Sequence, residues 1–259
     1  RKSISLGLDP LDAIAIATIN CARHYELNHL GSIEDGKQAN FVVFDDLNDI
    51  QPNNVWHAGQ CVASDGELVE RLTTNTNWTP SFNTVHLPNT LSEKSFSIQT
   101  EAKKIRVIGI LDGQLVTDEL HLEARKDGNE VIANPNNDVL KLAVIERHHS
   151  TGNIGIGFVQ GFGFRGGALA STVGHDAHNV AVVGDNDEDM LIAAKALGEA
   201  GGGQCVVSNR QVTAMLPLPI AGLMSNAEPE TVIQQQQKVL DSALQLGCKM
   251  EDPFMPLSF

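Results

Sequence analysis

The chain has 259 residues and a formal net charge of −14, because 32 Asp and Glu outnumber 18 Lys and Arg. Such an acidic chain is a poor candidate for binding nucleic acid or an anionic membrane, since both partners select basic surfaces. The hydrophobic fraction of 42% predicts a globular protein with a core, and the length fits one large domain or two ordinary ones. No apolar run approaches the roughly 18 residues of a membrane-spanning helix.

The first predicted element is a helix that begins at Asp9 and ends before Gly31. Asp9 can cap its N-terminus, and Pro10 suits the first helical position. Apolar and small residues then recur at steps of three and four, which predicts one face packed on a core. The residues of this face are Leu11, Ile14, Ala17, Thr18, Cys21, Ala22 and Tyr25.

Short strands follow the helix. Residues 30–72 predict part of a small antiparallel β unit, with strands near 41–44 and within 55–63 and a hairpin turn at 64–67. Residues 73–89 are rich in Thr, Asn and Pro and have no periodicity, so they predict a linker or a surface crossing.

A second β-rich region begins near Ser95. Strands are expected at 103–111, 114–122 and 139–147, and a hairpin turn at Asp112 and Gly113 joins the first two. Helices are expected at about 186–199, where acidic residues suit the positive end of the helix dipole, and at 229–246. The order of elements predicts two bodies, the second an α+β or α/β domain.

The four cysteines lie far apart and form no C-x-x-C pair. This spacing fits neither a disulfide framework nor a zinc knuckle. We therefore expect reduced thiols and a cytoplasmic protein.

Chemically versatile side chains gather between residues 148 and 184, among glycines that let the backbone approach a ligand closely. His175, Asp176 and His178 lie between two apolar runs, so we expect them on a turn that joins two strands at one end of a sheet. They are the candidate catalytic residues, suited to ordering or moving a proton. The alternatives are a metal site, for which two His and one Asp are a bare minimum, and a polar turn that bonds its own backbone.

Four further residues are candidates for binding a substrate: Asn179, Arg165, His148 and His149. Arg165 could hold a carboxylate or simply cap carbonyl groups. For His148 and His149 the alternative is an exposed pair on a turn.

The segment 161–166 satisfies the pattern G-x-G-x-x-G, and Asp185 lies about 20 residues further on, as in a dinucleotide-binding fold. The glycines of the pattern are Gly161, Gly163 and Gly166. An NAD-binding domain is therefore an alternative, although the helix that should follow would have to form over 167–172, just before Gly174.

Residues 7–13 with 17–18, and then residues 30–43, resemble the exit segment of the amidohydrolase superfamily. In that family a helix after the last barrel strand leads through a glycine turn back to a small β-sandwich. The sequence departs from the pattern at Asn40, where the family usually has Asp, and at Asp35, where Pro is common.

A second set of segments resembles the C-terminal domain of bacterial adenine deaminases. The matching segments are 146–149, 151–155, 161–167, 172–179, 186–190, 201–203 and 217–225. The resemblance implies a hydrolase that converts adenine and water to hypoxanthine and ammonia. It also implies a dinuclear manganese or iron site that generates hydroxide.

The family's metal ligands, which include an H-x-H pair and a late Asp, have no counterpart in this sequence. We therefore expect the C-terminal part of such an enzyme, without its (β/α)8 barrel, ligating no metal and inactive alone. The expected fold is the end of an amidohydrolase β-sandwich followed by an α/β domain of mixed sheet with flanking helices. The expected parts are 1–29, a helix after the last barrel strand; 30–90, part of the sandwich and a linker; and 91–259, the C-terminal domain.

The expected partners are adenine, the protein's own barrel and a second copy of the chain, with no nucleic acid and no membrane. One hypothesis is that residues 174–179 reach the barrel mouth and help to bind adenine or move its proton. The alternative is a structural domain that buttresses the barrel or builds a dimer interface.

Overall fold

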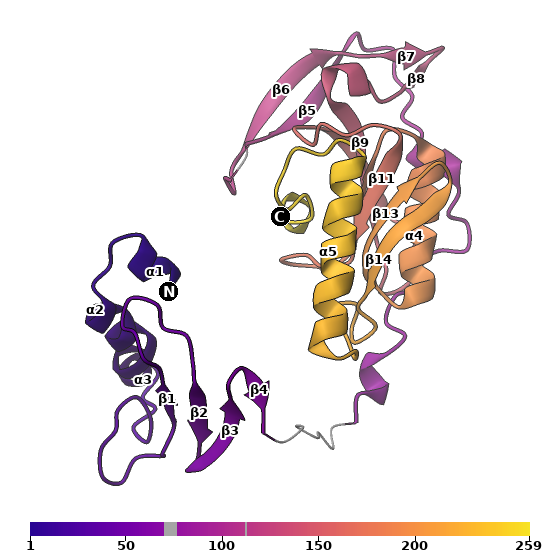
Figure 1. Cartoon of the computed structure of the whole chain (residues 1–259). Helices are drawn as coiled ribbons and strands as arrows, with labels where there is room; N and C mark the ends of the chain where they lie inside the picture. The colour runs from indigo at the N-terminus through magenta and orange to yellow at the C-terminus, as the bar shows by residue number, and fades with distance from the viewer. Residues whose placement is uncertain (70–76, 112) are drawn as a thin grey trace. The chain divides into compact units, whose positions relative to one another are not determined.

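A computed structural model describes residues 1–69, 77–111 and 113–259. Contacts divide the chain into two compact units, Arg1–Thr76 and Asn77–Phe259 (Figure 1). In the part of the chain that the structure describes, no helix is long and apolar enough to cross a bilayer.

The first unit begins with helical segments, as predicted. They are α1 (Lys2–Ser5), α2 (Pro10–Ala15), the π-helical turn η1 (Ile16–Asn20) and α3 (Cys21–His24). The Asp9 carboxylate accepts hydrogen bonds from the Leu11 and Asp12 amides at 2.9 and 3.3 Å, which confirms the predicted cap.

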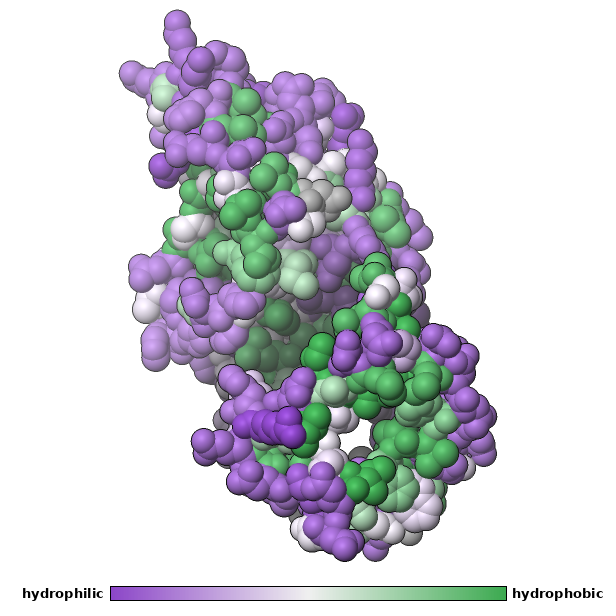
Figure 2. Space-filling model, turned by 90° about the vertical axis from the view of Figure 1, so that its left-hand side faces the viewer, coloured by the Kyte–Doolittle hydropathy of each residue, from purple (hydrophilic) through white to green (hydrophobic). Residues whose placement is uncertain are grey.

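The predicted buried face of this helix is largely exposed, so that expectation is wrong for this unit by itself. Leu11 is 65% exposed and Tyr25 is 70% exposed, and Ala22 is the one buried residue among residues 1–69. A loop does pack against Ala22, because a Cβ at Gly31 would lie 2.6 Å from the Ala22 Cβ. The periodicity is real, but within this unit no second apolar layer covers it. Figure 2 shows hydrophobic residues at the surface of this unit, in the lower part of the view.

The rest of the first unit is an antiparallel sheet in the order β1-β2-β3-β4, as predicted for residues 30–72. Its strands are β1 (Phe41–Val43), β2 (Asn54–His57), β3 (Gln60–Ser64) and β4 (Glu67–Leu68). The rings of Phe41 and Trp56 stack across β1 and β2 with centroids 5.5 Å apart. Residues 70–72 of the prediction lie outside the described residues.

The second unit is built on an eight-stranded sheet in the order β14-β13-β11-β12-β9-β10-β5-β6. All neighbours are antiparallel except β5 and β10, which are parallel. The strands are β5 (Lys104–Ile110), β6 (Thr117–Glu123), β9 (Val139–Ile145), β10 (Ile154–Gln160), β11 (Gly167–Ser171), β12 (Val180–Gly184), β13 (Gly203–Ser208) and β14 (Gln211–Pro217). The predicted turn residue Asp112 lies outside the described residues.

Two helices cover opposite faces of this sheet, α4 (Asp187–Ala200) and α5 (Pro229–Gln245) (Figure 1). Both were predicted to within one residue at each end. Asn186 caps α4 by accepting a hydrogen bond from the Asp189 amide at 2.8 Å, and Gly201 ends it with φ 77°. The mixed α+β class is therefore confirmed.

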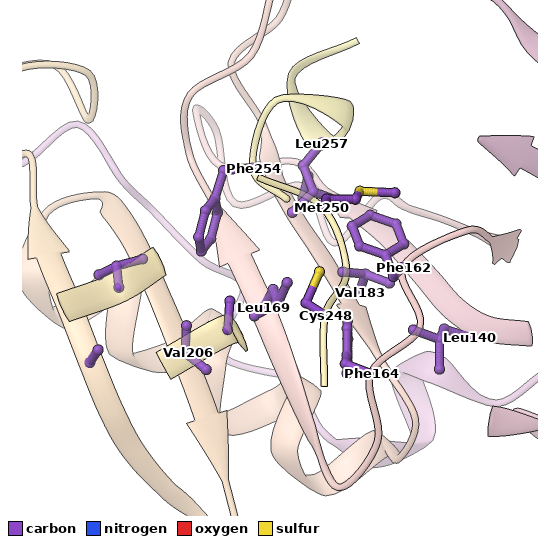
Figure 3. Close-up of a cluster of buried hydrophobic side chains, with 14 of the residues drawn as sticks. Leu140, Phe162, Phe164, Leu169, Val183, Val206, Cys248, Met250, Phe254 and Leu257 are labelled. Carbon is purple, nitrogen blue, oxygen red and sulfur yellow. The ribbon is translucent and has the colours of Figure 1, made fainter. Parts of the chain in front are cut away.

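Strand β11 shows how the sheet is buried on both faces. The Leu169 side chain packs on the α5 side, whereas Ala168 and Ala170 pack on the α4 side. Figure 3 shows the core on the α5 side, where Leu169 and Phe164 lie together with Cys248 of the C-terminal segment. Smaller elements complete the unit: β7 (Lys126–Asp127), β8 (Glu130–Val131), η2 (Thr79–Ser81), η3 (Glu93–Phe96), η4 (Pro135–Asn137) and η5 (Pro256–Ser258).

Residues 77–89 do not simply cross the surface, which corrects the prediction for 73–89; residues 73–76 lie outside the described residues. Val85 is buried in the core on the α4 side, and the His86 amide donates a hydrogen bond to the Arg147 carbonyl at 2.7 Å. Single apolar residues anchor this segment, and they leave no periodic signal in the sequence.

Candidate functional site

The candidate catalytic residues lie on the loop of residues 174–179, named here the site loop. It joins the antiparallel strands β11 and β12, as predicted. Strand β9 ends beside it, because Ile145 pairs with Val180. The structure thus brings His148 and His149 to the same end of the sheet as the site loop. The Nε2 atom of His148 lies 2.6 Å from the Ala177 carbonyl oxygen.

Two candidate side chains, His175 and Asp176, are exposed on the site loop. The His175 ring stacks on the Phe259 ring with centroids 4.0 Å apart, and its amide donates a hydrogen bond to the Ser258 carbonyl at 2.7 Å. The C-terminal segment therefore supports this side of the loop.

The other two loop candidates, His178 and Asn179, are half-buried. His178 has a positive φ of 47°, which is unusual for a residue with a side chain. Its Nδ1 atom and the Oδ1 atom of Asn179 are buried and have no hydrogen-bond partner among the described residues. Buried polar atoms without a partner are costly, so these two atoms are available to a ligand or a water molecule.

Glu146 shapes the turn that carries the two neighbouring histidines. Its carboxylate accepts hydrogen bonds from the His148 amide, the His149 amide at 2.9 Å, and the Thr151 amide and hydroxyl at 3.0 and 2.9 Å. These donors, the Thr151 amide first, lower the pKa of the Glu146 carboxyl to about 2. The ring of His149 remains exposed.

Arg147 was not singled out by the sequence, yet it is 2% exposed and contacts the site loop. Its guanidinium donates hydrogen bonds to the carbonyls of His178, Thr84 (3.2 Å) and Ala221 (3.0 Å). Burial lowers the pKa of this guanidinium. Its position directly before His148 and His149 was the available signal.

Arg165 lies at the other end of β11 from the site loop. The strand between them has five residues, which corresponds to about 16 Å at the usual rise per residue. Arg165 is exposed, and its amide donates a hydrogen bond to the Leu246 carbonyl at 3.1 Å. The structure does not bring this candidate together with the others.

The glycine pattern at 161–166 is used to build a loop and does not open a helix, because β11 begins at Gly167. The Gly166 and Gly167 amides donate hydrogen bonds to the Asp185 carboxylate at 2.6 and 3.1 Å. Asp138, which the sequence did not reveal, accepts in the same way from the Gly161 and Gly163 amides at 3.0 and 2.6 Å. The NAD-binding alternative is therefore not favoured.

The metal reading of the site loop finds no support in its geometry. Nowhere among residues 1–69, 77–111 and 113–259 do three His, Cys, Asp or Glu side chains gather in a way that could hold a metal ion. The His175 ring is instead engaged with Phe259. The described residues do not fit the dinuclear site that the family resemblance implies.

A cavity of about 620 Å³ lies between one face of β5, β9 and β10 and the C-terminal segment. Its walls are mainly apolar and include Ile108, Val144 and Phe162, and Phe259 links it to the His175 ring. A second cavity of about 730 Å³ lies around the N-terminus of α4. It is polar, and Lys141 within it is paired with Asp187 at 2.7 Å.

Comparisons with known proteins match both units. Residues 114–259 match the adenine deaminase C-terminal domain, and residues 3–87 match the amidohydrolase family. The adenine deaminase of Desulforamulus reducens is 43% identical over the whole chain, that of Clostridium botulinum strain Langeland 41%, and that of Methanothrix thermoacetophila 40%. The chain spans only 44–45% of the length of these relatives. Because one family model covers more than half of the sequence, this chain belongs to the adenine deaminase C-terminal domain family.

Proposed function

We propose that this chain is part of a metal-dependent aminohydrolase that converts adenine and water to hypoxanthine and ammonia. The observation that carries the proposal is the 43% identity, over the whole chain, to a relative named adenine deaminase. The relatives are named for an enzymatic activity, so the matches do not favour a purely structural role.

Within that enzyme, the site loop is proposed to contact the purine or a proton in transfer. Hydrolytic deamination takes a proton from water and delivers one to the departing amine. Imidazole suits such transfers because its ordinary pKa lies near neutral pH. His175, Asp176 and His178 are the proposed transfer groups, and Asn179 and the His148–His149 pair are proposed to bind the substrate beside them. The gathering of these groups at one end of the sheet supports this assignment.

The cofactor is proposed to be a dinuclear manganese or iron centre whose ligands lie outside the described residues, since those residues offer no fit. The same proposal gives the complete protein an N-terminal (β/α)8 barrel, a second copy as partner and a place in the cytoplasm. The proposed parts of the chain are 1–29, a helix that follows the last barrel strand; 30–90, part of the small β-sandwich and a linker; and 91–259, the C-terminal domain.

The test measures ammonia release from adenine by the complete protein, with its mass and metal content. We expect turnover by the complete protein and none by residues 1–259 alone. His178→Ala in the complete protein should lower kcat by about 100-fold or more, the usual contribution of a proton-transfer group.

The matched control is His121→Ala, which removes an exposed histidine on β6 that pairs with Glu119 at 3.1 Å. It should leave kcat unchanged. If the complete protein releases no ammonia, the proposed activity is wrong. If His178→Ala has wild-type kinetics, the activity stands but His178 has no part in it.

A further inference from the structure

A buried cation lies directly beneath the site loop. The Arg147 side chain is enclosed by the protein, and among the described residues no carboxylate pairs with it. Its hydrogen-bond acceptors are instead the backbone carbonyls of His178, Thr84 and Ala221, which lie 31, 63 and 74 positions away in the sequence, and the Thr84 hydroxyl at 3.4 Å. A buried guanidinium must satisfy its donors, so these bonds fix three distant segments around one point.

The residues packed around the Arg147 side chain hold its guanidinium in one position. A Cβ at Gly222 would lie 2.6 Å from the Arg147 Nη1 atom, so the backbone there approaches as closely as glycine allows. Thr172 holds that backbone in place, since its hydroxyl donates to the Gly222 carbonyl at 2.5 Å and accepts from the Gly203 amide at 2.7 Å. The guanidinium is thus clamped from behind.

The same guanidinium sets the backbone of the site loop. Its Nε–H donates to the carbonyl of His178, the residue whose positive φ is unfavourable without support. The next residue along the chain, His148, contacts the Ala177 carbonyl oxygen. Two consecutive residues therefore hold two consecutive loop carbonyls, and the direction of the His178 side chain follows from that backbone.

We propose that Arg147 is the positioning residue of the site loop: it holds the His178 carbonyl and thereby fixes where the loop side chains meet the substrate. The inference rests on the proposed function. Arg147 is buried and its donors are engaged, so it acts through the loop and does not touch the substrate.

The test substitutes Arg147→Lys in the complete protein and measures kcat, KM and amide hydrogen exchange over residues 174–179. Lysine keeps the charge, but its single ammonium group lacks the fork that spans separate carbonyls. We expect exchange of the site loop to accelerate by about tenfold or more. We expect kcat to fall by about 10- to 100-fold while KM changes much less, because small misplacements of reacting groups act on the rate.

Two further variants keep the test decisive if Arg147→Lys does not fold. Gly222→Ala leaves the charge intact but places a Cβ against the guanidinium, at a φ of 70° that alanine also strains, and it should loosen the site loop and lower kcat in the same way. Arg125→Met is a control away from the site loop, since the exposed Arg125 also donates to a backbone carbonyl, that of Ala133 at 3.0 Å. It lines the polar cavity at the α4 N-terminus, so its loss should leave both the loop exchange and kcat unchanged.

Unchanged exchange over residues 174–179 in both Arg147→Lys and Gly222→Ala would overturn the proposal, whatever the activity. A loosened loop with wild-type kcat would also overturn it, because the loop would then be held without being used. Equal effects in Arg125→Met would show a general loss of stability and count against it as well. Absence of adenine turnover in the unmutated protein contradicts the proposed function instead, and the exchange data still report whether Arg147 holds the loop.

Discussion

Helix α2 of the first unit and helix α4 of the second have equally good capping and periodicity signals in the sequence, but they differ in whether their apolar faces are covered by other elements. Asp9 caps α2 in the first unit and Asn186 caps α4 in the second. The apolar face of α4 packs against the sheet through Met190 and Leu197, whereas Ala22 is the one buried residue among residues 1–69. Capping and periodicity decide where a helix forms, but a second apolar layer supplies most of its stability.

The two tryptophans make this difference measurable, because Trp56 lies in the first unit and Trp78 in the second. Replacing either one by phenylalanine leaves a fluorescence probe for the other unit. We expect the first unit to unfold at lower denaturant concentration than the second.

The largest expected effect is a loss of core packing in the second unit. Phe164 is fully buried against the α5 side of the core, so Phe164→Ala should lower the free energy of unfolding by about 3–5 kcal/mol. Urea titration followed by Trp78 fluorescence measures it. Leu11→Ala in the first unit is the comparison, and it should cost no more than about 0.5 kcal/mol because Leu11 is exposed. A large effect at Leu11 would mean that its face is covered in solution.

A smaller effect is expected at the carboxylate that braces the glycine loop. Asp185→Ala removes the acceptor of the Gly166 and Gly167 amides and should cost about 1–3 kcal/mol, because the amide of the buried Gly167 loses its partner. The counterpart in the first unit is Asp9→Ala, which should cost about 1 kcal/mol through loss of a helix cap. A larger cost at Asp9 than at Asp185, measured by the same titration, would contradict the distinction between the two units.

The pH dependence of stability should also differ between the units. The pKa of Glu146 is lowered from 4.5 to about 2, so its contribution is present above about pH 4.5 and is lost as the pH falls toward 2. Glu146→Gln should remove this part of the acid destabilisation of the second unit. Thermal unfolding between pH 2 and pH 6, in about half-unit steps, checks the sign. Glu34→Gln, at an exposed residue of the first unit, serves as the control. If it changed the acid destabilisation as much as Glu146→Gln does, that would argue against a specific role for Glu146.

The smallest expected effect is a difference in thiol reactivity between the two units, which can be measured without changing the stability of the protein. Burial raises the pKa of the Cys205 thiol to about 12, and Cys248 is also buried with a raised pKa, while Cys21 is exposed. At pH 8, Cys21 should react rapidly with a maleimide, whereas Cys205 and Cys248 should react only after unfolding. Mass spectrometry of the labelled peptides identifies each site. Rapid labelling of Cys205 in the folded protein would show that the second unit opens more readily than its core implies.

Sequence reasoning succeeded where the signal was local. Helix α5, helix α4 with its Asn186 cap, and the turn between β11 and β12 all follow from neighbouring residues. The glycine pattern at 161–166 was open to two readings, because the same local pattern can precede a helix or a strand.

The rest depended on partners distant in the sequence. Nothing near Arg147 indicates that Thr84 and Ala221 will supply carbonyls to its side chain. Asp138 likewise accepts from amides more than twenty residues away, at Gly161 and Gly163. From sequence alone, a charged residue is expected to be exposed to solvent. The roles of Arg147 and Asp138 depend on partners that only the fold brings together, so the sequence pattern could not predict them.

The pairing of β5 with β10, the one parallel pairing among the described strands of the large sheet, has a consequence for how the chain assembles. Strands β5 and β6 pair along seven residues each, but β5 joins β10 through only two registered pairs, Val159 with Ile108 and Gln160 with Gly109. A parallel junction requires a long intervening segment to close first, and such closures are slow. The β5–β6 hairpin should therefore dock after the antiparallel strands from β9 to β14 have formed, and it is the part of the sheet most able to detach without unfolding the remainder.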